Sequence, residues 1–161
     1  MGRRITAIIA QKHNPQRVNI YLDGEFAFGL SRIVAAWLSV GQELDDEKIA
    51  SLQQEDALEV AYQIALNLLS YRNRTEAEVR AHLAKKGIGE DIIQSVLERL
   101  QRSDLLNDRQ FAQEWVENRN DYRPRGRRAL VYELRQKGVP DEAIQAAVEE
   151  LDEEKLAYQA A

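Results

Sequence analysis

Residues 122–138 read YRPRGRRALVYELRQKG, which places a dense group of arginines directly before an amphipathic helical pattern. Residues 71–87, which lie 51 positions earlier, read YRNRTEAEVRAHLAKKG and align with this stretch without a gap. Apolar matches continue beyond the shared glycine as far as Leu100 and Leu151. The sequence therefore contains an internal repeat of a helical unit. The identical positions are Tyr71, Arg72, Arg74, Leu83, Lys86 and Gly87, which match Tyr122, Arg123, Arg125, Leu134, Lys137 and Gly138.

Helix start and stop signals predict three helices in each repeat. Thr75 and Glu78 have the spacing of a capping box, and Gly87 has the position of a left-handed residue that ends a helix. Asn107 and Gln110 repeat the capping-box spacing in the second unit. Six helices are expected: a long one from Asp45 and Asp46 to Tyr71, then helices near 75–87, 92–100, 107–116, 127–137 and 140–151.

Strand-like residues precede the helices. Residues 4–10, 17–22 and 25–30 are rich in β-branched and aromatic side chains, and Asp23-Gly24 is a hairpin signal between the last two stretches. They predict a three-stranded antiparallel sheet, which buries too little apolar surface to be stable without helices packed on it. Ser31 is expected to cap a short helix ended by Gly41.

Tryptophans at helical spacing with aliphatic residues, Trp37 and Trp115, are interpreted as packing residues rather than as stacking platforms for bases. The predicted fold is mainly α: tandem three-helix repeats in an elongated array, preceded by the small sheet. The expected regions are a β-rich part at 1–44, a first repeat at 45–103, a second at 104–152, and the start of a third at 153–161.

The charge is unevenly distributed along the chain. The net charge is -5, yet residues 71–137 hold fifteen Lys and Arg against eleven Asp and Glu. Arginine binds phosphate or carboxylate oxygens through two parallel hydrogen bonds, so the basic middle is a candidate anion-binding surface. The alternative is a solvated linker whose arginines pair with Glu114, Glu117 and Asp121. The candidate binding residues are Arg72, Arg74, Lys85, Lys86, Arg123, Arg125, Arg127 and Arg128.

Signals of catalysis are weak throughout the sequence. There is no cysteine, the two histidines His13 and His82 lack the spacing of metal ligands, and no GxxxxGK phosphate loop is present. We therefore expect a protein that is not an enzyme and needs no cofactor. No apolar run is long enough to span a membrane, and the N-terminus lacks a signal peptide, so a cytoplasmic protein is expected.

Linked motifs resemble the bacterial regulatory family RecX. They are the Tyr71-Arg-x-Arg stretch with its capped helix, the Leu83-x-x-Lys-Gly ending, the LLND segment at 105–108, and the NIYLDGEFAF segment at 19–28. The resemblance implies a monomeric, non-catalytic modulator that binds the RecA filament on single-stranded DNA. It further implies inhibition of recombination, ATP hydrolysis and coprotease action, by blocking filament growth or promoting disassembly. It also implies three tandem repeats, of which this sequence carries two and the first residues of the next.

Two other functions are compatible with the same residues. One is a non-specific DNA-binding helical module, because each three-helix unit resembles a helix-turn-helix in outline. The predicted helix at 92–100 has Arg99 as its single cation, which disfavours reading of base edges. The other is a protein-binding helical scaffold, in which the arginines lie at the rim of an interface.

Overall fold

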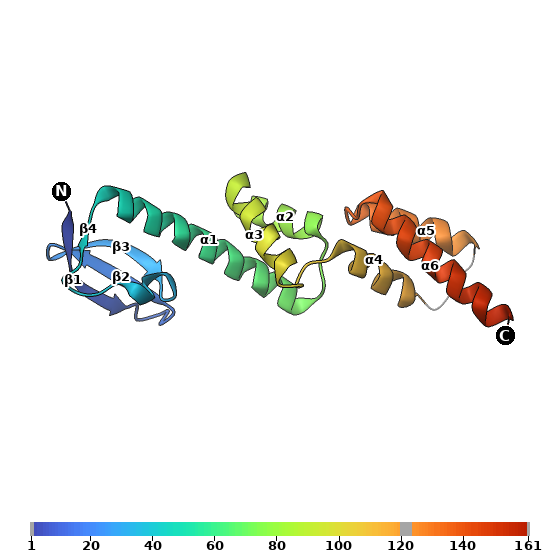
Figure 1. Cartoon of the computed structure of the whole chain (residues 1–161), viewed down its shortest axis with the longest axis horizontal. Coiled ribbons are helices and arrows are strands. Elements are labelled where there is room, and N and C mark those ends of the chain that lie inside the picture. Colours follow the sequence, from blue (N-terminus) through green and yellow to red (C-terminus); the bar gives the residue numbers. More distant parts are fainter. Residues whose placement is uncertain (1, 120–123, 161) are drawn as a thin grey trace. The chain divides into compact units, whose positions relative to one another are not determined.

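The structure is a computed structural model that describes residues 2–119 and 124–160, with the backbone alone for residues 124–125 and 153–160. The chain forms two compact units, Met1–Gln63 and Ile64–Ala161. The first unit holds a small sheet and most of a long helix, and the second holds the remaining helices (Figure 1).

The sheet of the first unit is antiparallel, with strand order β3-β2-β1-β4. Its strands are β1 (Arg3–Ala10), β2 (Arg17–Leu22), β3 (Glu25–Ser31) and β4 (Glu43–Leu44). The three predicted strands are confirmed, and Asp23 and Gly24 adopt the positive φ angles of 50° and 86° expected for the hairpin. Strand β4 was not predicted, because two residues are too few to show an alternating pattern.

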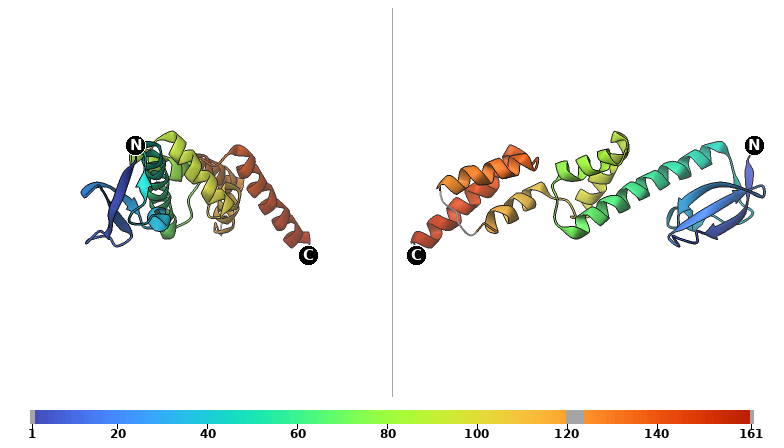
Figure 2. Two further views of the ribbon diagram at one scale, coloured as in Figure 1. Left: turned by 60° about the vertical axis from the view of Figure 1, so that its left-hand side comes forward. Right: turned by 180° about the vertical axis from the view of Figure 1, so that it is seen from behind.

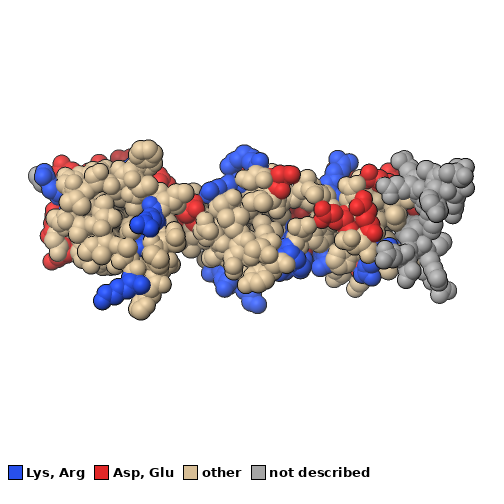
Figure 3. Space-filling model, turned by 90° about the horizontal axis from the view of Figure 1, so that it is seen from below, with Lys and Arg blue, Asp and Glu red and all other residues tan. Residues whose placement is uncertain are grey.

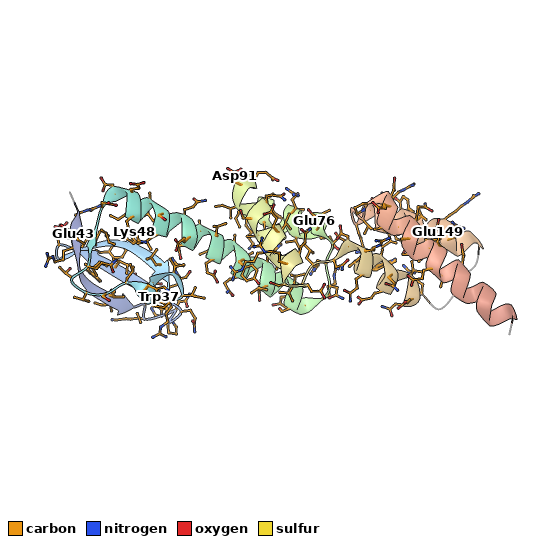
Figure 4. The ribbon with its side chains drawn as sticks, in the orientation of Figure 1. Trp37, Glu43, Lys48, Glu76, Asp91 and Glu149 are labelled. Carbon is orange, nitrogen blue, oxygen red and sulfur yellow. The ribbon has the colours of Figure 1, made fainter. Side chains whose placement is uncertain are left out.

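The segment after β3 differs from the prediction. A 3-10 helix, η1 (Val34–Trp37), forms without a side-chain cap, and Ser31 belongs to β3 instead. Trp37 is 92% exposed, so its interpretation as a packing residue is wrong (Figure 4). A helix of four residues is too short to bury a stripe with a 3.6-residue period. Val34 and Leu38 pack on the core, and the indole of Trp37 is left in solvent.

Helix α1 (Asp46–Tyr71) begins as predicted, with the side chain of Asp45 accepting a hydrogen bond from the Lys48 amide at 2.7 Å. Apolar side chains of its first turns, Ile49 and Leu52, join the buried face of the sheet. This burial supplies the apolar contact that such a small sheet requires.

A polar contact also holds α1 on the sheet. The carboxylate of Asp56 accepts hydrogen bonds from the amide and the hydroxyl of Ser31, at 2.6 and 2.7 Å. The guanidinium of Arg17 pairs with the same carboxylate at 3.1 Å. Burial raises the pKa of Asp56, but the hydrogen bonds from Arg17 and Ser31 outweigh it and hold the pKa below its ordinary value.

The second unit contains the last turns of α1 and five further helices (Figures 1 and 2). Helix α5 starts at Pro124, three residues before the predicted start at 127, because proline has a preset φ that suits the first helical position. Helices α5 and α6 lie side by side. The five helices are α2 (Glu76–Lys85), α3 (Glu90–Arg102), α4 (Asp108–Glu117), α5 (Pro124–Gln136) and α6 (Asp141–Ala160).

Equivalent positions of the two repeats are buried alike. Leu83 and Leu134 are both fully buried, and so are three further pairs. The ends of α2 and α5 also match, because Gly87 and Gly138 have φ angles of 83° and 80°. These observations confirm the internal repeat and both glycine helix ends. The further pairs, each with 3% exposure or less, are Val79 with Leu130, Ile93 with Ile144, and Leu97 with Val148.

Capping differs between the repeats. Thr75 and Glu78 form the predicted capping box, with hydrogen bonds in both directions. Asn107 accepts a hydrogen bond from the Gln110 amide at 3.1 Å, but the side chain of Gln110 bonds to Glu114 instead of returning to Asn107. The second capping box is therefore half formed.

We predict that Asp56→Asn lowers the free energy of unfolding by about 2 kcal/mol at pH 7. The substitution removes the negative charge that accepts hydrogen bonds from Ser31 and Arg17. A carboxyl with a lowered folded-state pKa contributes stability above its unfolded pKa and loses it as the pH falls through the folded value. The difference between wild type and variant should therefore shrink below about pH 4. Urea unfolding at pH 7 and at low pH measures both quantities, and a constant difference would contradict the assignment.

Candidate functional site

The predicted binding residues lie in two groups on the helical unit. Arg72 and Arg74 are in the loop before α2, and Lys85 and Lys86 are at its end. Arg127 and Arg128 are in the first turns of α5. The backbone of Arg125 lies in α5, but its side chain and the whole of Arg123 lie outside the described residues.

Two of these arginines point to one carboxylate. The Arg72 guanidinium pairs with Glu78 at 2.7 Å and also donates to the Asn73 carbonyl at 2.9 Å. Arg74 lies 3.8 Å from the same carboxylate oxygen. Burial raises the pKa of Glu78, but hydrogen bonds from Arg72 and from the Thr75 amide outweigh it and lower the pKa overall. The single negative charge of Glu78 thus offsets one of the two positive charges of Arg72 and Arg74.

The remaining described cations differ in their availability. Arg127 pairs with Asp152 at 3.0 Å, a partner that sequence reasoning missed because it lies one helix away. Lys85, Lys86 and Arg128 are exposed, and within the part of the chain that the structure describes none of them pairs with a carboxylate. These three side chains are the freest of the predicted cations whose side chains the structure describes.

Charge on the helical unit is mixed. Figure 3 shows basic and acidic atoms interspersed on the face that it presents, rather than one continuous basic surface. Arg80 pairs with Glu90, and Arg135 pairs with Asp141 at 3.0 Å. Positive charge on this surface is therefore better described as a few separate cations than as one broad basic patch.

The two repeats meet at the N-terminus of α2. The hydroxyl of Thr75 is fully buried and donates to the carbonyl of Lys137 at 2.6 Å. It also accepts from the Glu78 amide at 3.1 Å, so it serves both repeats. Next to it, Gly138 packs so closely on α2 that an added Cβ would overlap the Cβ of Ala77.

Two more hydrogen bonds cross this junction. The Asp108 carboxylate accepts from the free amide of Glu76 at 2.8 Å, and Asn73 donates to Glu114 at 2.8 Å. Burial raises the pKa of the Asp108 carboxyl, and the nearby carboxylates of Glu76 and Glu78 raise it as well. The hydrogen bond from the Glu76 amide lowers it, but the net pKa lies above the ordinary value. The junction is therefore polar, with hydrogen-bond partners for the first amides of α2.

A small polar pocket opens beside the junction. Arg74 is one of its lining residues, and the buried Nε of Arg74 finds no acceptor among the described residues. Sequence reasoning missed it, because its walls come from two loops and from α4, which only folding brings together. The lining residues are Asn73, Arg74, Asp104, Leu105, Asn107, Gln110, Phe111 and Glu114.

Trp115 packs as predicted. Its ring stacks on Phe111 with centroids 6.0 Å apart, and its indole donates to Glu133 at 2.8 Å. The Lys137 ammonium lies 4.9 Å from the ring centroid, where it makes a cation–π contact. The ring of Trp115 and the ammonium of Lys137 thus contact each other within the chain.

The described residues, 2–119 and 124–160, hold neither a metal site nor a membrane-spanning helix. No group of His, Cys, Asp or Glu is arranged there to hold a metal ion. In the same residues, no helix has the length and apolar character needed to cross a membrane.

Comparison with known proteins relates all parts of this fold to one family. The RecX N-terminal domain matches residues 3–45, and the first and second three-helix domains of RecX match residues 61–100 and 107–148. A crystal structure of regulatory protein RecX superposes with a TM-score of 0.78 at 31% identity, over 92% of this chain and 74% of that chain. The chain belongs to the RecX family.

Curated relatives share the family name "Regulatory protein RecX". The relative from Bacillus licheniformis is 40% identical over 146 residues, which is 89% of this chain and 56% of the relative. The relative from Oceanobacillus iheyensis is 37% identical over 155 residues, 92% of this chain and 57% of the relative. This RecX-family chain thus spans a little over half the length of the curated relatives it matches.

We predict that the two helix-ending glycines respond differently to substitution. Gly87→Ala should cost about 1 kcal/mol through its positive φ alone, since nothing lies near the added Cβ. Gly138→Ala should cost about 2–4 kcal/mol, because it also forces the α5–α6 turn away from Ala77. Urea unfolding measures both, and adding Ala77→Gly to Gly138→Ala should recover part of the loss. Equal losses at the two glycines would contradict this contact.

Asp108→Asn should leave stability at pH 7 equal or higher, because asparagine can still accept the hydrogen bond from Glu76 without the charge. Asp108→Ala removes the acceptor and should cost about 1 kcal/mol. A raised folded-state pKa means that wild type loses stability as the pH rises through that value. The advantage of Asp108→Asn should therefore grow from about pH 4 to pH 7. Thermal unfolding at both pH values tests this, and similar losses in the two variants would refute it.

Proposed function

We propose that this RecX-family chain is a non-catalytic regulator that binds the RecA filament on single-stranded DNA. In this proposal it inhibits recombination, ATP hydrolysis and coprotease action, by blocking filament growth or by promoting disassembly. It acts as a cytoplasmic monomer and without a cofactor. The observation that carries the proposal is the match of three successive RecX domains along the chain, in a family whose curated members are named regulatory proteins.

The exposed cations supply the contacts in this proposal. Lys85 and Lys86 at the end of α2 and Arg128 in α5 are exposed and pair with no carboxylate among the described residues, so they can meet DNA phosphates or acidic side chains of the filament. Arg72, Arg74 and Arg127 already have carboxylate partners, so each of them contributes less. Arg123 and Arg125 stay in the proposed set.

The junction between the repeats supports a shared surface. Its hydrogen bonds connect the start of α2 with the α5–α6 turn and with the start of α4. Both groups of cations are therefore carried by helices that are linked through buried or half-buried polar contacts. Holding charged groups on packed helices lowers the entropy lost when they bind an extended partner.

The test is the single-strand-dependent ATP hydrolysis of RecA from the same organism, with this chain added at sub-stoichiometric and at stoichiometric ratios. Inhibition at low ratios is expected if the chain acts at filament ends or promotes disassembly. Absence of both inhibition and filament binding would overturn the proposal and favour a protein-binding scaffold. Binding to DNA alone, with affinity that falls steeply with salt and no effect on RecA, would favour a non-specific DNA-binding module.

We predict that replacing Lys85, Lys86 and Arg128 together by alanine weakens inhibition roughly tenfold. Each exposed charge contact contributes about 0.5 kcal/mol, so three of them together match the roughly 1.4 kcal/mol of a tenfold change. The control is alanine at Arg3, Lys48 and Arg102, which are exposed and outside the proposed set. This control has the same change in net charge. Equal weakening in both triple variants would show that net charge, rather than this surface, determines the inhibition.

A further inference from the structure

Three exposed apolar side chains lie in the segment that follows β3. Trp37 is 92% exposed, Ile33 is 64% exposed and Val40 is 63% exposed. A tryptophan in this state is unusual, because its large apolar ring loses favourable burial. Exposed apolar side chains gathered in one segment are candidates for a binding surface.

The segment is ordered by its own contacts, so Trp37 is held outward by a packed backbone. Ala35 is buried, and the Leu38 amide donates to its carbonyl at 3.0 Å. The following turn is closed by a hydrogen bond from the Gln42 amide to the Ser39 carbonyl at 3.1 Å. The exposed indole is thus presented on a defined support.

Positive charge gathers at the same end of the sheet. Arg32 is exposed and directly precedes Ile33. Its amide donates to the Gln16 carbonyl at 2.7 Å, which places it beside the β1–β2 turn with the exposed Lys12. Arg17, at this end too, is paired with Asp56 and adds no net charge.

One acidic side chain at this end, Asp56, is the partner of Arg17. Glu43 is at the other end of the sheet unit from Trp37 in Figure 4. Figure 3 views the unit from the side on which Trp37 lies in Figure 4, and it shows basic atoms among uncharged ones with acidic atoms at the margins. The surface therefore combines an open aromatic ring with positive charge.

We infer that this end of the sheet unit binds single-stranded nucleic acid, with a base stacked on Trp37 and phosphates at Arg32 and Lys12. Unpaired bases offer a flat ring for stacking, and the backbone supplies the negative charge that the two cations match. This inference goes beyond the proposed function, because it assigns a second contact surface on the N-terminal unit. It depends on none of the eight cations of the helical unit.

The test uses the full chain with Trp115→Phe, which leaves Trp37 as the single tryptophan of the two in the sequence. Circular dichroism confirms that the variant is folded. A thymidine oligonucleotide of roughly 15 nucleotides is titrated in at about 50 mM and about 200 mM salt. Binding should quench the emission of Trp37, with an affinity that falls as the salt concentration rises.

Variants separate stacking from simple apolar contact. In a binding titration with a labelled oligonucleotide, Trp37→Leu should bind about tenfold more weakly, whereas Trp37→Phe should stay near wild type. Arg32→Ala should reduce the log–log salt slope by about 0.7. The control is Phe26→Leu, which changes an exposed ring near the opposite end of β3 and should leave binding unchanged.

Several results would overturn the inference. They are an absence of quenching, wild-type affinity in Trp37→Leu, or an equal loss in Phe26→Leu. An acidic protein segment would then be the better candidate for this surface. The titration contains no RecA, so its outcome is independent of the filament proposal.

Discussion

The hydroxyl of Thr75 is the contact on which the helical unit depends. Among the described residues, Thr75 has the one fully buried polar side chain. By accepting from the Glu78 amide and donating to the Lys137 carbonyl, it satisfies the start of α2 and the end of α5 together. Gly126 stands at the equivalent position of the second repeat and has no side chain that could do the same. The repeats are therefore alike in packing but unlike in this connection.

This junction also decides which cations are available. The glutamate that completes the capping box, Glu78, receives Arg72 and Arg74, so its single negative charge offsets part of the positive charge of the basic motif in the first repeat. In the proposed function, binding relies on Lys85, Lys86 and Arg128, whose long side chains are exposed near helix ends. A net negative chain can still present cations to an anionic partner, because their placement matters more than the sum of charges.

Local signals explain which predictions were correct. The Asp23-Gly24 hairpin, the Thr75 capping box and the glycine ends of α2 and α5 all depend on residues within a few positions of each other. The prediction that Ser31 caps a helix was wrong, because its amide and hydroxyl bind a distant carboxylate, that of Asp56. The prediction that Trp37 is buried was wrong, because its apparent helical spacing falls in a 3-10 helix, which has a different period.

The sequence by itself determined the long helices, the three longer strands, the repeat and the family resemblance, because backbone capping and apolar periodicity are encoded over short distances. Only the tertiary structure decided which charged residues are free, because ion pairs such as Arg127 with Asp152 and Arg17 with Asp56 join distant parts of the chain. It also created the pocket at Arg74 and exposed Trp37. Solvent exposure and pairing are properties of packed surfaces, and no local pattern in the sequence specifies them.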